Sequence, residues 1–301
     1  MAAPDQPEVV FVHDAEQEAG LGHRRRVEAL ATEVQRRGFP IRVQPIDAPV
    51  HAAAIVVDSY RTRADDRTRY DAAVVGAIDD LERDLAVDVV IDPSPGANTD
   101  AHRRAEVVLA GADYAIVDPA LAGRASDPII DDVTRVLVTT GAADRAGVGV
   151  RIARALATAS FANEPCAFEV RLVVGPWGSQ VVPPGVTPVR VTTGLAEELA
   201  RAGVVVTAGG VTLLESLVLG RPTVCVVVAE NQRRAAEAVA AAGAAVGAVP
   251  ESAASEVAAL IAVPQRRRDL ATRAHEVVDG RGAARVADAI VAALTARCGG
   301  S

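Results

Sequence analysis

The segment from Val206 to Gln232 constrains the fold of this chain more than any other stretch of the sequence. A run of β-branched apolar residues, Val204–Thr207, ends at the pair Gly209-Gly210, which breaks a strand. Thr212–Leu219 has the apolar spacing of a helix, and a glycine and a proline then end it. A second apolar run, Thr223–Val228, has the composition of a buried strand. The segment therefore predicts two parallel strands joined by a glycine turn and a helix.

The glycine turn before this predicted helix has the chemistry of a phosphate site. Backbone N–H groups at a helix N-terminus lack an intrahelical partner and attract anions, which makes Gly209, Gly210 and Thr212 candidate diphosphate-binding residues. Glu215 follows about one turn later, where a carboxylate would repel phosphate but accept hydrogen bonds from the two hydroxyls of a ribose. Diphosphate followed by ribose describes a nucleotide-sugar site. The alternative is that the glycines only permit close packing and that Glu215 interacts favourably with the helix dipole.

Strand-like and helical segments alternate along nearly the whole chain, which is the pattern of βαβ units in a mostly parallel sheet. In the first half a helix is predicted over Gly22–Arg37, and the predicted strands are Glu8–His13, Ile41–Ile46, Ala54–Asp58, Val74–Ile78, Asp88–Ile91 and Tyr114–Val117. In the second half the predicted strands are Arg135–Thr140, Glu169–Gly175, Val186–Thr192, Val204–Thr207, Thr223–Val228 and Ala245–Val249. The predicted helices of that half are Gly147–Ala159, Leu195–Ala202, Thr212–Leu219, Asn231–Ala242, Glu251–Ala262, Arg266–Asp279 and Gly282–Ala296.

The alternation loosens in the acidic, proline-bearing stretch Asp118–Asp132, where we place a linker. A chain of 301 residues is the right length for two α/β domains. We predict an N-terminal Rossmann-like domain over 1–125, a C-terminal Rossmann-like nucleotide-binding domain over 133–280, and a C-terminal helix with a disordered tail over 281–301. The carboxyl ends of the strands in such sheets face the ligand crevice. The predicted fold class is therefore α/β, with two Rossmann-type domains facing each other across a cleft.

The composition excludes several classes of function. The net charge is −8 and no basic face offsets it, which argues against binding to nucleic acid or to an anionic membrane. The 3 cysteines are far apart and fit neither a disulfide framework nor a zinc cluster, and Cys225 reads as a small buried apolar residue. The N-terminus lacks the architecture of a signal peptide and no apolar run is long enough to span a membrane. We expect a cytoplasmic protein.

A histidine stands where the first predicted helix begins, after the loop that follows the first strand. Gly22 lets the backbone turn there and is a candidate sugar contact. His23 lies beside the positive end of the helix, which favours a neutral imidazole that can act as a general base. The alternative is a surface histidine at a helix cap. Tyr60 follows the strand Ala54–Asp58, and it either presents its hydroxyl to the cleft or packs under a loop.

Further polar candidates stand at the predicted ends of other strands. Asn231 and Gln232 open a helix and either cap it or contact the sugar or a water. Gly141 lies in a loop that is a weaker phosphate candidate. Asp79-Asp80 are expected to cap a turn, because no third ligand at metal spacing accompanies them. For this reason we predict no metal site. Arg24–Arg26 are expected to form a solvated helix face.

Six motifs follow one another along the chain: GLGH followed by Arg26, VVDSY, AIDDLERDLAVDVVIDP, GAADRAG, AGGVTLLESLVLGRPTV and AENQ, with VDGRGAARVADAI near the C-terminus. In these motifs and their order the chain resembles the UDP-sugar hydrolases of pseudaminic acid biosynthesis, a group that includes proteins labelled spore-coat polysaccharide glycosyltransferases. The resemblance spans most of the chain. It implies a GT-B-like fold of two domains, no metal or other cofactor, and attack of water on the anomeric carbon of a UDP-linked deoxyamino sugar.

The resemblance also assigns roles to individual residues. By position, His23 corresponds to the general base of the group, and Tyr60 and Asn231 correspond to its polar active-site partners. Gly209, Gly210 and Glu215 correspond to its nucleotide-binding helix.

The chain departs from the group in the loops expected to touch the sugar and the phosphate. The group usually has an arginine where Val12 stands, serine-rich residues where Ala15–Gln17 stand, and a second glycine where Ala142 stands. The nucleophile therefore stays open. It is water in a hydrolase that releases UDP with inversion, or a small-molecule or polysaccharide acceptor in a GT-B glycosyltransferase. A third reading, a non-catalytic nucleotide-sugar binder, does not use His23, Tyr60 and Asn231 together.

Overall fold

The computed structural model describes residues 6–14, 21–124, 132–144, 146–159, 168–178, 180–190 and 194–298. Residues 299–301 of the predicted C-terminal tail, residues 125–131 of the predicted linker, Ala15–Gln17 and Cys166 lie outside the described residues. The chain divides into two compact units. Unit 1 comprises 1–119 and 280–301, and unit 2 comprises 120–279. The segment 281–301, predicted to stand apart from both domains, groups with unit 1.

Unit 1 is built on a sheet of six parallel strands in the order β2-β1-β3-β4-β5-β6. The strands are β1 (Val9–His13), β2 (Ile41–Pro45), β3 (Ala54–Asp58), β4 (Val74–Ile78), β5 (Val89–Asp92) and β6 (Val107–Ala110). Every residue of β1, β3, β4 and β5 is buried. Unbroken apolar runs of this kind are typical of parallel strands that are covered on both faces.

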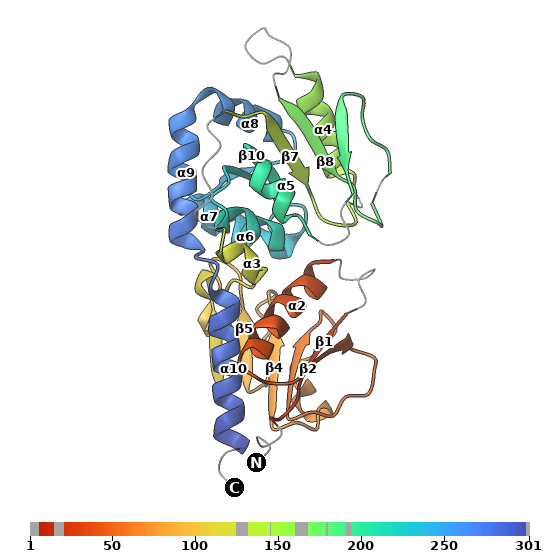
Figure 1. Cartoon of the computed structure of the whole chain (residues 1–301), viewed down its shortest axis with the longest axis vertical. Helices are drawn as coiled ribbons and strands as arrows, with labels where there is room; N and C mark the ends of the chain where they lie inside the picture. Colours follow the sequence, from red (N-terminus) through yellow and green to blue (C-terminus); the bar gives the residue numbers. More distant parts are fainter. Residues whose placement is uncertain are drawn as a thin grey trace. The chain divides into compact units, whose positions relative to one another are not determined.

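Two long helices, α2 (Leu21–Arg36) and α10 (Gly282–Cys298), lie side by side on one face of this sheet (Figure 1). Their apolar residues share one core with β1, β3, β4, β5 and β6. The opposite face packs against side chains of the connecting segments, among them Tyr70, Leu85 and Val87. The remaining helical pieces before residue 123 are α3 (Pro119–Ala122) and the 3₁₀ helices Asp66–Arg69, Thr99–Ala101 and Ala112–Tyr114.

Unit 2 has a second sheet of six parallel strands, in the order β12-β11-β10-β7-β8-β9. The strands are β7 (Arg135–Thr139), β8 (Glu169–Val173), β9 (Val186–Val189), β10 (Val204–Ala208), β11 (Thr223–Val226) and β12 (Val246–Ala248). The helices are α4 (Val148–Thr158), α5 (Ala196–Arg201), α6 (Val211–Val218), α7 (Arg233–Ala241), α8 (Ala253–Ala262) and α9 (Pro264–Val277), with a 3₁₀ helix over Glu230–Gln232 (Figure 1). Helices α4 and α8 pack on the sheet in one core.

The predicted strand Tyr114–Val117 is wrong, and the sixth strand of unit 1 lies earlier in the chain. Strand β6 (Val107–Ala110) occupies that edge of the sheet, although Val107 is exposed and its run is short. Ala115–Val117 are buried without joining the ladder. Their backbone instead lies against the start of α10, where a Cβ added to Gly282 would meet the carbonyl oxygen of Ala115 at 2.2 Å. The apolar composition of this run reflects its burial and not pairing in a sheet.

Cys225 confirms the prediction of a small buried apolar residue. It lies in β11 with none of its surface exposed. Burial raises the pKa of its thiol to about 12, so the thiolate that would make a cysteine reactive is disfavoured.

Candidate functional site

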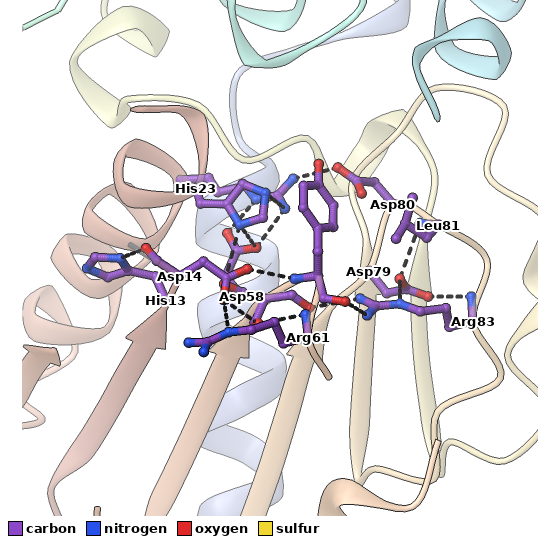
Figure 2. Close-up of polar contacts among 12 residues, drawn as sticks. His13, Asp14, His23, Asp58, Arg61, Asp79, Asp80, Leu81 and Arg83 are labelled. Atoms are coloured by element: carbon purple, nitrogen blue, oxygen red, sulfur yellow. Dashed lines mark hydrogen bonds and ion pairs between the residues drawn. The ribbon is translucent and has the colours of Figure 1, made fainter. Parts of the chain in front are cut away.

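The sheet of unit 1 has a topological switch point between β1 and β3. From β1 the chain moves to β2 on one side, and the next strand, β3, is added on the other side of β1. Ligands of open α/β sheets bind outside the carboxyl ends of the strands at such a point. Asp14 directly follows β1, and Ser59 and Tyr60 directly follow β3. The first turn of α2 brings His23 to the same edge (Figure 2).

The imidazole of His23 is held by the last residue of β3. Its Nδ1 lies 3.0 Å from Oδ1 of Asp58 and 3.3 Å from the Asp58 carbonyl oxygen (Figure 2). Both of these oxygens are acceptors, so Nδ1 is the nitrogen that carries the proton in a neutral ring. The lone pair then lies on Nε2, the nitrogen that could accept a proton from a reactant.

A buried arginine completes this arrangement. Arg26 donates from Nε to Oδ2 of Asp58 at 2.5 Å and from a terminal nitrogen to Oδ1 at 2.6 Å. Its other terminal nitrogen donates to Oδ2 of Asp80 at 3.0 Å. The first of these terminal nitrogens also lies 3.4 Å from Nε2 of His23. Both ring nitrogens of His23 therefore have a partner, and only 3% of the residue is exposed.

The charges of this cluster are coupled. Burial raises the pKa of the Asp58 carboxyl, but the charge and hydrogen bonds of Arg26 outweigh burial, and the pKa of Asp58 falls below its usual value. Burial likewise opposes the charge of Arg26, but Asp58 and Asp80 outweigh it and raise the pKa of the guanidinium well above its usual value. The surroundings of Asp58 therefore favour its ionised form in the folded protein.

Tyr60 packs its ring edge-on against the His23 ring, with 4.4 Å between the ring centroids and 71° between the planes. Its backbone N–H donates to Oδ2 of Asp14 at 2.8 Å, and the Ser59 hydroxyl donates to Oδ1 of the same carboxylate at 2.6 Å. Asp14 therefore fixes the turn that carries Tyr60. The residue is 41% exposed, so it forms an accessible surface beside the buried histidine.

The structure corrects two expectations about polar residues of unit 1. Arg26 is not part of a solvated helix face, because it is only 6% exposed and binds Asp58. Asp80 binds Arg26 and does not serve as a turn cap, whereas Asp79 does, since its carboxylate accepts from the backbone N–H groups of Leu81 and Arg83 (Figure 2). Asp58 and Arg26 were missed as site residues, although Arg26 follows His23 by three positions and so shares its helical face.

Unit 2 has its own switch point, between β7 and β10. Gly209 and Gly210 follow β10 at this point and lead directly into α6. A Cβ added to Gly209 would lie 2.8 Å from the carbonyl oxygen of Gln232, whereas one added to Gly210 would meet nothing within 4 Å. The first glycine thus allows the segment of Asn231 and Gln232 to approach the turn, and the second leaves the start of α6 open.

The other predicted residues of unit 2 lie around this turn. Thr212 is half-buried in the first turn of α6, and Glu215 lies on the same helix and is 5% exposed. Asn231 and Gln232 are half-buried in the 3₁₀ helix, and the side-chain oxygen of Gln232 accepts from the backbone N–H of Val228 at 3.3 Å. The structure therefore brings Gln232 against Gly209.

Gly141 lies after β7 with a φ of +101°, which favours glycine. The neighbouring loop uses its own carboxylate at the start of α4. Oδ1 of Asp144 accepts from the backbone N–H of Gly149 at 3.1 Å, and Oδ2 accepts from that of Val150 at 3.4 Å. These two N–H groups are thus engaged within the protein, whereas α6 has no side-chain cap at Gly210.

Among the residues that the structure describes, no helix is both long and apolar enough to cross a membrane. In the same part of the chain, no group of three or more His, Cys, Asp or Glu side chains is placed to hold a metal ion.

Comparison with known proteins gives matches in structure but not in sequence. No protein-family model matches the chain, and no curated protein matches it significantly in sequence. MurG of Acinetobacter baumannii is similar in structure, with a TM-score of 0.60 and 14% identity over 95% of this chain and 99% of that one. The UDP-GlcNAc 2-epimerase of Neisseria meningitidis, solved with UDP-GlcNAc bound, has a TM-score of 0.57 and 15% identity over 96% of this chain and 100% of that one.

A third similar structure is the spinosyn forosaminyltransferase SpnP, with a TM-score of 0.54 and 14% identity over 95% of this chain and 99% of that one. At these identities the likeness establishes the fold. The prediction of two Rossmann-type units is confirmed, and the chain has the fold of the GT-B glycosyltransferases.

Proposed function

We propose that the protein is a nucleotide-sugar enzyme that cleaves the anomeric C–O bond of a UDP-linked deoxyamino sugar. Water is the nucleophile, His23 is the base, the configuration inverts and UDP leaves. The observation that carries the proposal is the contact of His23 Nδ1 with the buried carboxylate of Asp58 at 3.0 Å, which assigns the lone pair to Nε2. The fold adds support, because structures with the same fold include glycosyltransferases and an epimerase solved with UDP-GlcNAc.

In this proposal unit 2 binds the nucleotide. The diphosphate accepts from the backbone N–H groups at Gly209, Gly210 and Thr212, where α6 begins without a side-chain cap. Glu215 accepts from the ribose hydroxyls. Gly141, in the loop after the neighbouring strand β7, contacts the phosphates from the other side of the switch point.

Polar groups near the reacting carbon complete the proposed site. Asn231 and Gln232 hydrogen-bond the sugar or the water, and Gln232 is already placed against the glycine turn. Gly22 offers its backbone to the sugar at the start of α2. Tyr60 supplies an accessible ring and hydroxyl beside the base.

The proposed reaction forms one bond to the anomeric carbon and breaks another. An O–H proton of water moves to Nε2 of His23, the water oxygen bonds to the anomeric carbon, and the bond from that carbon to the phosphate oxygen breaks with its electron pair on UDP. His23 must exchange its 3.4 Å contact with Arg26 for the water when substrate binds. A positioned base contributes about 10²–10⁴-fold, so stabilisation of the departing diphosphate at α6 has to supply much of the rest.

Glycosyl transfer is the second candidate. The same base would take the proton from an acceptor hydroxyl or amine instead of water, and the glycosyltransferases among the similar structures favour this reading. The two functions differ in what happens without acceptor. A hydrolase releases nucleotide continuously, whereas a transferase binds the nucleotide sugar and releases nucleotide only slowly.

The base assignment is tested with His23→Asn, measured as UDP release and, separately, as UDP binding by calorimetry. We expect binding to stay unchanged and release to fall by about 10²–10⁴-fold. His51→Asn is the matched control, because the His51 side chain is 82% exposed and lies away from the cluster. Unchanged release by His23→Asn would rule out His23 as the base.

A further inference from the structure

Arg26 lies one turn after His23 on α2, and its guanidinium is buried beside the proposed base. It spans two carboxylates, with two hydrogen bonds to Asp58 and one to Asp80. A buried ion is expensive unless it is paired and hydrogen-bonded. Each of the three guanidinium nitrogens donates to a carboxylate here, so the cation has a fixed position and remains charged.

The groups that face His23 come from every element packed against it in the described part of unit 1. Asp58 at the end of β3 lies against Nδ1, Arg26 of α2 lies against Nε2, and the Tyr60 ring lies against the ring edge. Asp80 and Asp14 lie one contact further out, bound to Arg26 and to the turn of Tyr60. One anion and one cation therefore touch the imidazole directly, on opposite nitrogens.

These two charges act on the imidazole in opposite directions. An isolated carboxylate beside a histidine favours the protonated ring. Asp58 is not isolated, because both of its oxygens accept from Arg26. At Nε2, an Arg26 N–H group points to the nitrogen at 3.4 Å, a contact that a lone pair accepts and a second N–H group would oppose. The geometry thus favours the neutral ring with its proton on Nδ1.

We propose that Arg26 is a positioning residue that keeps His23 in the neutral Nδ1–H form, with the lone pair of Nε2 ready to take a proton. Asp58 sets which nitrogen carries the proton, and Arg26 prevents the same carboxylate from drawing a second proton onto the ring. The catalytic meaning of this role rests on the proposed function, whereas the state of the ring does not.

The test compares the wild type with Arg26→Met by ¹⁵N NMR of the histidine side chains. The chain has only 5 histidines, and His23→Asn identifies the signals of His23. At neutral pH we expect wild-type His23 to show one protonated nitrogen, Nδ1, and one unprotonated nitrogen, Nε2. In Arg26→Met both nitrogens should be protonated, because Asp58 then has no other cation.

Two further variants keep the test decisive if Arg26→Met folds poorly. Arg26→Lys retains the cation without the fork and should keep His23 neutral. The double variant Arg26→Met/Asp58→Asn removes both charges, and its His23 should be neutral without a fixed choice of nitrogen. An arginine that served only the fold would leave the ring unchanged in every variant that folds.

The proposal is overturned if wild-type His23 carries its proton on Nε2, or if Arg26→Met retains the neutral Nδ1–H ring. The NMR measurement needs no substrate. The two proposals can therefore fail separately. If the NMR spectra show the expected ring states but the protein releases no nucleotide from any sugar, the role of Arg26 is upheld and the proposed function is rejected.

Discussion

The close approach of Gln232 to Gly209 gives a sharp prediction about the proposed nucleotide turn. In Gly209→Ala the new Cβ would meet the carbonyl oxygen of Gln232 at 2.8 Å and its Cβ at 2.9 Å. The first of these atoms belongs to the backbone, so the segment that carries Asn231 has to move. Forcing an extra carbon into a packed site costs about 1–3 kcal/mol. The smaller conformational freedom of alanine in the unfolded chain returns about 0.4–1 kcal/mol.

We therefore expect Gly209→Ala to lower the free energy of unfolding of unit 2 by about 1–2 kcal/mol, which corresponds to a fall in Tm of about 2–8 °C. Gly210→Ala is the matched control, because its Cβ would meet nothing within 4 Å and its φ is −104°. The assay is denaturant unfolding followed by the fluorescence of Trp177, the chain's only tryptophan, which lies in unit 2. Equal destabilisation by the two variants would refute the close contact. UDP binding should weaken in Gly209→Ala as well.

Two other predictions concern buried carboxylates. Because Arg26 lowers the pKa of Asp58, the ion pair stabilises the folded protein above the usual carboxyl pKa, and this contribution is lost as the pH falls through the lowered value. Asp58→Asn should thus be destabilised by about 3–5 kcal/mol at neutral pH. In urea titrations the difference in the free energy of unfolding between Asp58→Asn and the wild type should become smaller in acid. A difference that does not change with pH would contradict the ion pair between Arg26 and Asp58. Glu215→Gln should weaken UDP binding about tenfold by calorimetry, since a neutral acceptor loses about 1 kcal/mol or more. Equal affinities would exclude Glu215 from the ribose site.

Most of the fold could be predicted from the sequence because the strands carry their own signal. β3 and β4 are short apolar runs that end at aspartates, and the structure has them at the predicted residues. Strand β6 could not be predicted in this way, because an edge strand is stabilised by pairing with β5 and its residues are only partly buried. The buried run after it does not join the sheet and packs against the start of α10 instead.

The candidate site was predicted less completely, for a related reason. His23 and Tyr60 were identified from their places at strand and helix ends, and the structure brings their rings together. Arg26 looked like one of three solvated arginines, because local sequence does not show which face of a helix meets a strand end. Its burial follows from the ion pair with Asp58, which ends β3 beside the first turns of α2.

The measurement that tests the central claim most directly is nucleotide release from UDP-, CDP-, GDP- and dTDP-linked sugars by the purified protein without acceptor. The wild type and His23→Asn are measured side by side by chromatography. We predict that one UDP-linked deoxyamino sugar gives UDP and free sugar in equal amounts, and that His23→Asn binds this substrate but barely turns it over. Tight binding with negligible release would favour the glycosyltransferase. Failure of the protein to bind any nucleotide sugar, or full release by His23→Asn, would contradict the account.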